Sequence, residues 1–104
     1  MLTVVESPIF QRLWPRYRDE EERGEFAAFI AANSEAGAVI RGSGGVRKVR
    51  WAREGTGKSS GVRIVYLTRN ELGEVYLLTL YAKSETSSIA AATLKEIRRA
   101  LEED

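Results

Sequence analysis

The N-terminal residues combine one short apolar run with one helical pattern. The run Leu2–Val5 is apolar and partly β-branched, which is typical of a strand at the edge of a sheet. Pro8 suits the first turn of a helix, and Pro15 should kink or end that helix near Trp14. The apolar residues of this helix recur at helical spacing: Ile9, Phe10, Leu13, Trp14 and Tyr17.

A second helix is predicted to begin after Asp19. This residue can cap the helix, and Glu22 three residues later completes a capping box. The segment from Asn33 to Gly37 is expected to end it. The buried stripe of this helix comprises Phe26, Phe29 and Ile30. We assign four large aromatic side chains to the core: Trp14, Phe26, Phe29 and Trp51.

Three strands follow, and short links join them. Their predicted ranges are Val46–Arg53, Val62–Thr68 and Glu74–Ala82. Strands with short links between them pair as an antiparallel meander. Apolar residues on both faces of the third strand indicate that it lies inside the sheet. Alternation along the first strand puts Lys48 and Arg50 on one face, with Val49 and Trp51 on the other.

Two further segments complete the pattern. Arg41–Gly45 contains three glycines, which can adopt positive φ and approach a ligand closely; a tight turn before the strand explains them equally well. Ser87 is expected to cap a C-terminal helix with a periodic apolar face: Ala90, Leu94, Ile97 and Leu101. The prediction is an α+β fold with two N-terminal helices, an antiparallel sheet of three to four strands and the C-terminal helix, all in one domain over residues 1–104. One face of the sheet should pack on helices, and the basic face should be open to solvent or a ligand.

Composition excludes several kinds of chemistry. The chain has 104 residues, 43% of them hydrophobic, and it contains no cysteine and no histidine. Disulfides, thiolate metal sites and every mechanism that needs a histidine base are therefore impossible within it. We expect no cofactor and no metal. The N-terminus lacks a signal-peptide pattern and no apolar run could span a bilayer, so we expect a soluble cytoplasmic protein without membrane contact.

The net charge of +1 conceals an uneven distribution. Residues 1–40 and residues 71–104 each hold four basic and seven acidic side chains, a net charge of −3. Residues 41–70 hold a single acid, Glu54. The same residues carry eight basic side chains: Arg41, Arg47, Lys48, Arg50, Arg53, Lys58, Arg63 and Arg69. A segment of net charge +7 indicates a site for a polyanion, although a solvated strand face with scattered ion pairs would also explain it.

The segment Gly57-Lys58-Ser59 matches the end of a phosphate-binding P-loop. The first glycine of that motif is absent, because Ala52 occupies its position. A P-loop must also lead into a helix, whereas the following residues, Val62–Leu67, are β-branched and aromatic and predict a strand. A loop between two strands is therefore the better interpretation.

Three segments stand in an informative order: Gly42-Ser43-Gly44-Gly45-Val46-Arg47-Lys48-Val49-Arg50-Trp51, Gly57-Lys58-x-x-Gly61-x-Arg63-Ile64-Val65-Tyr66, and Leu78-x-Leu80-Tyr81-Ala82-Lys83. Together they resemble the RelE/HigB toxins of bacterial type II toxin–antitoxin systems. The first segment resembles the HigB-like subgroup with a G-x-G-G-x-R-K-x-R signature. The resemblance covers nearly the whole chain.

The resemblance implies a small RelE-like α+β toxin that enters the ribosomal A site and cuts the bound mRNA. It also implies a cognate antitoxin with a helix-turn-helix domain that neutralises the toxin. The complex of the two would bind operator DNA through the antitoxin. Such an enzyme is a metal-independent endoribonuclease in which the RNA 2′-OH attacks the neighbouring phosphodiester. Fixed cations suit this chemistry, because negative charge accumulates on the phosphate oxygens in the transition state.

The resemblance assigns roles to individual residues. Arg63 is expected to clamp the phosphate, Lys83 to give acid–base or electrostatic help, and Lys48 and Arg50 to hold RNA or transfer protons. Further contacts to mRNA or ribosomal RNA are expected from Arg47, Lys58, Tyr66 and Tyr81. Each role has an ordinary alternative: a structural ion pair for Arg63, an exposed lysine for Lys83, and core packing for both tyrosines.

Three positions depart from the family pattern. Ser59 and Ser60 replace an expected arginine and glycine, and Ser84 stands where some relatives carry another arginine. At positions 59 and 84 the serine in place of an arginine reduces the positive charge near the expected site. Two alternatives to the enzyme therefore stay open: a weakened toxin that binds RNA or the ribosome without cutting, and a basic surface that docks an acidic protein partner.

Overall fold

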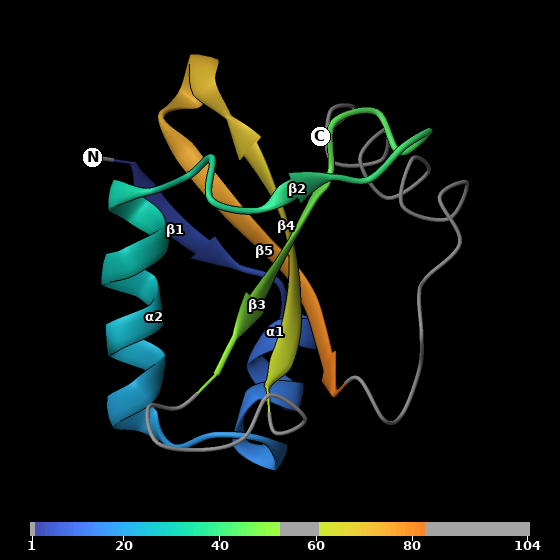
Figure 1. Ribbon diagram of the computed structural model, residues 1–104. Helices are drawn as coiled ribbons and strands as arrows, with labels where there is room; N and C mark the ends of the chain where they lie inside the picture. The colour runs from blue at the N-terminus through green and yellow to red at the C-terminus, as the bar shows by residue number, and fades with distance from the viewer. Residues whose placement is uncertain (1, 53–60, 83–104) are drawn as a thin grey trace.

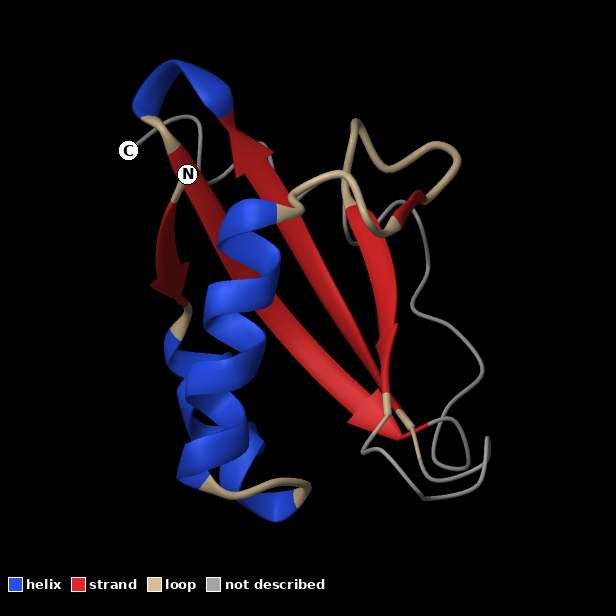
Figure 2. Ribbon diagram, turned by 60° about the vertical axis from the view of Figure 1, so that its left-hand side comes forward, coloured by secondary structure: helices blue, strands red, loops and turns tan. Residues whose placement is uncertain are grey.

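The computed structural model describes residues 2–52 and 61–82, which form a five-stranded sheet with helices on one face (Figures 1 and 2). The strands are β1 (Thr3–Glu6), β2 (Ala38–Val39), β3 (Arg47–Trp51), β4 (Val62–Arg69) and β5 (Glu74–Ala82). The helices are α1 (Pro8–Leu13) and α2 (Glu20–Ala32), with short 3-10 turns at Trp14–Arg16 and Asn70–Leu72. The α+β class expected from the sequence is confirmed.

The strand order is β1-β5-β4-β3-β2. The meander of β3, β4 and β5 is antiparallel, and β5 lies inside the sheet, as expected. Two features differ from the expectation of an antiparallel sheet of three to four strands. β2 adds a two-residue edge strand, too short for a sequence pattern, and β1 runs parallel to β5. Parallel strands need a long connection between them. In the chain, both helices and strands β2 to β4 separate β1 from β5, and the helices carry the chain from the β1 edge of the sheet to the β2 edge.

Both helices begin and end where the sequence predicts. The Ser7 hydroxyl accepts a hydrogen bond from Phe10 N and caps α1, while Pro15 lies in the 3-10 turn that follows it. The Asp19 carboxylate accepts from Glu22 N and caps α2. The Ser7 hydroxyl also donates to Leu78 O at 2.7 Å. Leu78 is the extra residue of a β-bulge, so one buried hydroxyl joins a helix start to an irregular carbonyl of β5.

The main core lies between the helices and the sheet. Phe10, Trp14 and Phe26 are at most 1% exposed, and the Trp14 ring contacts the rings of the other two. The expectation for Phe29 was wrong in degree, because 36% of this residue is exposed while one side of its ring contacts Trp51.

The Trp51 indole ties β3 to helix α2. Its N–H donates to the Glu22 carboxylate at 2.9 Å. The same carboxylate, which is buried, forms an ion pair with Arg18 at 3.0 Å. The predicted capping-box acid therefore connects α2 to the sheet. A buried carboxylate needs such partners, since an unpaired one would be costly.

A second set of contacts, around Tyr66, joins the segment between α2 and β2 to strands β3 and β4. Tyr66 is fully buried; its hydroxyl donates to Ser34 O at 2.9 Å and accepts from Gly37 N at 2.8 Å. Arg47 donates to Gly37 O at 2.7 Å. Gly37 has no room for a side chain, because a Cβ would lie 2.8 Å from Lys48 O and 2.9 Å from the Tyr66 ring.

The glycine-rich turn before β3 is well ordered by its own contacts. Gly42, Gly44 and Gly45 have φ values of 76°, 79° and 104°, a region that favours glycine. Between them, Ser43 is fully buried and its hydroxyl donates to Ile40 O while accepting from Val46 N. These contacts give the glycines a structural role as a tight turn before the strand.

The outer face of the sheet carries a smaller core of its own. Val65, Leu67, Leu78 and Tyr81 cluster there and are at most 7% exposed. The expectation that this whole face is basic and open to solvent is therefore too simple. Because β5 is apolar on both faces, the basic side chains of this face lie on β3 and at the two ends of β4, with Arg63 near its start and Arg69 at its end.

Several expectations fall outside the described residues. They are the C-terminal helix from Ser87, the end of the first predicted strand at Arg53, and the Gly57-Lys58-Ser59 segment. The residues after that segment do form a strand, β4, as the argument against a P-loop requires. Within the part of the chain that the structure describes, no helix has the length and apolar character needed to cross a membrane.

Replacing Gly37 by alanine should destabilise the fold. The new methyl group would meet the backbone carbonyl of Lys48, which cannot rotate away, so we expect the free energy of unfolding to fall by about 2–3 kcal/mol. Gly24→Ala is the matched control: it lies in α2 with no atom within 4 Å of the added carbon and should gain about 0.5–1 kcal/mol. Urea unfolding measures both changes. Full stability of Gly37→Ala would contradict this account.

Tyr66 should make the fold sensitive to alkali. Burial raises its pKa above the ordinary value of 10.0, and the hydrogen bond from Gly37 N opposes that shift. Above about pH 10 the unfolded chain releases this proton while the folded protein keeps it, so the free energy of unfolding falls as pH rises.

The variant Tyr66→Phe tests this expectation. It should be less stable at neutral pH, by about 1–3 kcal/mol, because Ser34 O and Gly37 N lose their partner. Its further loss of stability above about pH 10 should be smaller than that of the unaltered protein. Urea unfolding across this pH range measures both effects, with Tyr76→Phe as the control at a partly buried position. Equal alkaline slopes for the unaltered protein and Tyr66→Phe would refute the assignment.

Candidate functional site

The pairing of β3, β4 and β5 places charged side chains in a defined row. Arg50 lies directly opposite Arg63, and Arg63 lies directly opposite Tyr81. Lys48 lies two residues before Arg50 on the same face of β3, opposite Val65. Neighbouring strands are about 4.8 Å apart, so these cations lie close together. We call Lys48, Arg50 and Arg63 the basic patch.

Arg63 has the most unusual environment of the three. The residue is half-buried, and its Nη1 atom is buried with no hydrogen-bond partner among the described residues. A buried donor without a partner costs about 1–3 kcal/mol, more when it is charged. An anionic oxygen bound at this position would remove that cost.

Two members of the basic patch, Lys48 and Arg63, take no part in the ion pairs of the described residues. The ion pairs of the described residues join Arg18 to Glu22, and Arg23 to both Glu6 and Glu20. Glu6 raises the pKa of Arg23, which keeps this guanidinium charged. Three acids of the N-terminal segment are thus paired with arginines of the same segment: Glu6, Glu20 and Glu22. Neither Lys48 nor Arg63 forms an ion pair with a carboxylate in the described part of the chain.

Arg47 lies apart from the basic patch. In β3 it is one residue from Lys48, so its side chain points to the opposite face of the sheet. There its guanidinium donates to Gly37 O at 2.7 Å and, more weakly, to Glu35 O at 3.4 Å. The structure therefore gives Arg47 a role in holding the end of α2.

The two candidate tyrosines are both buried. Tyr66 is 0% exposed and has no surface on which a base could stack. Tyr81 is 7% exposed and lies beside Arg63 at the edge of the patch. Burial raises the pKa of the Tyr81 phenol, while the Arg63 charge lowers it. Core packing, the alternative considered for both residues, agrees with this burial.

Two other candidates, Lys58 and Lys83, lie outside the described residues. Lys83 directly follows Ala82, the last residue of β5, which pairs with Val62 next to Arg63. Conversely, the structure adds Gly61, which directly precedes β4. A Cβ at Gly61 would lie 2.9 Å from Arg50 Nε. This contact cannot be predicted from the sequence, because it depends on the register between β3 and β4.

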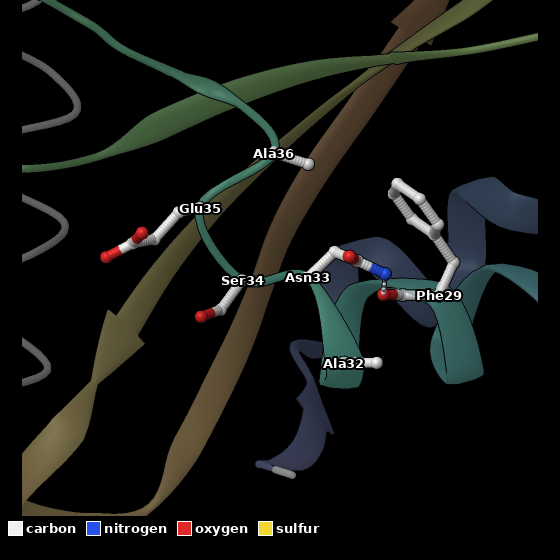
Figure 3. A pocket seen from close by; sticks show the side chains of 6 residues that line it. All are labelled: Phe29, Ala32, Asn33, Ser34, Glu35 and Ala36. Atoms are coloured by element: carbon white, nitrogen blue, oxygen red, sulfur yellow. Dashed lines mark hydrogen bonds between the residues drawn. The ribbon is translucent and has the colours of Figure 1, made fainter.

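A separate hollow lies at the C-terminal end of α2 (Figure 3). It has a volume of about 400 Å³ and is lined by Phe29, Ala32, Asn33, Ser34, Glu35 and Ala36. Two of the lining residues are joined along the last turn of the helix, where the Asn33 side chain donates to Phe29 O at 2.9 Å. Its lining includes no residue of the basic patch, so the hollow and the patch are distinct features.

Comparison with known proteins supports the fold expected from the resemblance. No protein-family model matches the chain. Among solved structures, a free Escherichia coli RelE toxin carrying two arginine-to-alanine substitutions matches with a TM-score of 0.64 and 16% identity, over 93% of this chain and 96% of that one. The isolated E. coli RelE toxin gives a TM-score of 0.59 and 16% identity, over 96% and 99%.

A third match is the intact E. coli RelBE toxin–antitoxin complex, with a TM-score of 0.59 and 18% identity, over 79% of this chain and 96% of that one. Identities this low establish the architecture, and the assignment to the HigB-like subgroup stays a prediction. The basic patch, the helices and the sheet order described above thus belong to a chain with the fold of the RelE toxin.

Proposed function

We propose that this protein is the toxin of a type II toxin–antitoxin system and that it cleaves mRNA on the ribosome. The observation that carries the proposal is the buried, unpartnered Nη1 of Arg63 within a patch of three cations. The fold shared with RelE supports the same conclusion. The proposal also places the protein in the cytoplasm, where it would encounter mRNA on the ribosome.

The proposed reaction is a metal-independent transesterification in which the RNA supplies the nucleophile. The 2′-oxygen attacks the adjacent phosphorus and gives its proton to a base, either water or a neutral lysine. The bond from phosphorus to the 5′-oxygen of the next nucleotide breaks, and that oxygen takes a proton from water or a lysine ammonium. Arg63 would hold the phosphate oxygens, where charge accumulates in the transition state. Lys48 and Arg50 would stabilise the same charge or hold the neighbouring backbone. The ribosome would supply the orientation of the substrate that a small protein cannot.

Lys83 and Lys58 complete the proposal from sequence. Lys83 would give acid–base or electrostatic help next to Arg63, and Lys58 would contact mRNA or ribosomal RNA. Arg47 and Tyr66 take no part in it, because their polar groups bind the end of α2. Tyr81 would line the edge of the site beside Arg63.

We propose that a cognate antitoxin is the protein partner. The likeness to a toxin captured in the RelBE toxin–antitoxin complex supports this partner class. A helix-turn-helix domain in the antitoxin would let the complex bind operator DNA, whereas the toxin alone would not.

A second function is favoured by one observation. Ser59, Ser60 and Ser84 replace residues that would add positive charge or flexibility near the patch. A toxin weakened in this way would bind RNA or the ribosome and block translation without cutting. Primer extension on cellular mRNA after induction separates the two functions: codon-linked cuts indicate the enzyme, and growth arrest without cuts indicates the blocker.

The variant Arg63→Ala should stay folded and lose toxicity. Loss of the phosphate clamp should lower mRNA cleavage by about 10²–10³-fold, the cost of removing one donor to a transition-state anion. Growth after induction and primer extension measure the effect. Arg69→Ala is the matched control, since it removes an arginine from the other end of the same strand, opposite Glu74.

The control variant should arrest growth as the unaltered protein does. Full toxicity of Arg63→Ala would remove this residue from the mechanism. Arrest without cuts by the unaltered protein, lost in Arg63→Ala, would replace the enzyme with the RNA-binding blocker.

A further inference from the structure

We propose that Gly61 is a positioning residue for the basic patch: its missing side chain determines where the Arg50 guanidinium lies relative to Arg63. The inference deepens the proposed function, because it concerns the geometry of the same RNA-binding patch. It assigns a role to a residue that contacts no substrate and acts through its neighbour.

The difficulty that Gly61 resolves is one of like charges. Arg50 and Arg63 are directly opposite residues on neighbouring antiparallel strands. Opposite side chains on one face have Cβ atoms about 5 Å apart, and like charges at such positions destabilise the pairing. Two arginines can share this position without close contact only if one of them leans away along the strands.

The structure shows the direction in which Arg50 leans. Gly61 precedes Arg63 by two residues, so it lies diagonally across from Arg50. A carbon added at Gly61 would lie 2.9 Å from Arg50 Nε and 3.4 Å from Arg50 Cγ. The Arg50 side chain therefore lies across the α-carbon of Gly61, which is buried beneath it.

In this arrangement the Arg50 side chain lies toward Gly61, and both arginines belong to the outer face of the sheet. Arg63 keeps its unpartnered Nη1, and Arg50 stands to one side of it. A side chain at position 61 would push Arg50 toward Arg63 or off the sheet. Either movement changes the spacing of the cations that a phosphate backbone would meet.

The contacts at Gly61 allow an effect on Arg50 to be distinguished from a general loss of packing. Apart from Arg50, the nearest atom to the added carbon is Trp51 O, at 3.4 Å, which is close to ordinary contact. If Arg50 is the obstacle, removing its side chain should remove the effect of an alanine at position 61. A double-mutant cycle tests this.

The first measurement is RNA affinity. The full chain is titrated with a short oligouridylate at fixed salt, because phosphate contacts depend on ionic strength. Gly61→Ala should weaken binding about tenfold, whereas in the Arg50→Ala background it should cause no further loss. Gly24→Ala is the matched control, since it adds the same methyl group in open space and should bind RNA as the unaltered protein does.

The second measurement needs no RNA. The Nε–H resonance of Arg50, assigned by its loss in Arg50→Ala, should shift in Gly61→Ala and stay in place in Gly24→Ala. An unshifted resonance in Gly61→Ala would overturn the positioning role. A shifted resonance with unchanged RNA affinity would show that the position of Arg50 does not matter for RNA binding, and would overturn that part of the proposal. An unaltered protein that neither binds RNA nor arrests translation would defeat the proposed function, and the resonance would still decide the role of Gly61.

Discussion

The register between β3 and β4 decides which side chains face the helices and which face outward. A slip of one residue would move every side chain of β3 to the other face of the sheet. Two polar contacts fix the register, one at each end of β3. Trp51 donates to Glu22 of α2 at one end. At the other end, Tyr66 binds Ser34 and Gly37 just beyond the same helix. Because α2 holds both ends, the basic patch is a consequence of the way the inner core is closed.

Local patterns in the sequence predict most of the elements, because their causes are local. A capping residue at Asp19, a proline at position 15 and alternation along the β strands are sufficient to place the helices and the meander. The parallel pairing of β1 with β5 was not foreseen, since it depends on how distant segments pack. Likewise, the apolar residues of β5 indicate that both faces of that strand are covered. They do not reveal how many residues of the other strands join the smaller core on the outer face.

The candidate site was predictable in outline for a similar reason. Alternation along β3 is enough to bring Lys48 and Arg50 to one face, and the charge count points to the same segment. The same alternation sends Arg47 to the face of the helices, where it binds Gly37 O, and its expected contact with RNA stays a prediction. Tyr66 and Gly61 could not be interpreted from sequence, because their roles depend on contacts with Gly37 and Arg50 across the fold. Residues whose function is to position others leave little trace in a single sequence.

The pairing of β1 with β5 has a consequence for synthesis of the protein. The first strand finds its neighbour in residues 74–77, and Ser7 finds Leu78, so these contacts join segments separated by most of the described chain. A nascent polypeptide that has not yet exposed β5 cannot complete the sheet. Long-range pairing of this kind slows folding, because the ends of a long loop must meet first. The described sheet, together with its basic patch, is therefore complete only after β5 has left the ribosome.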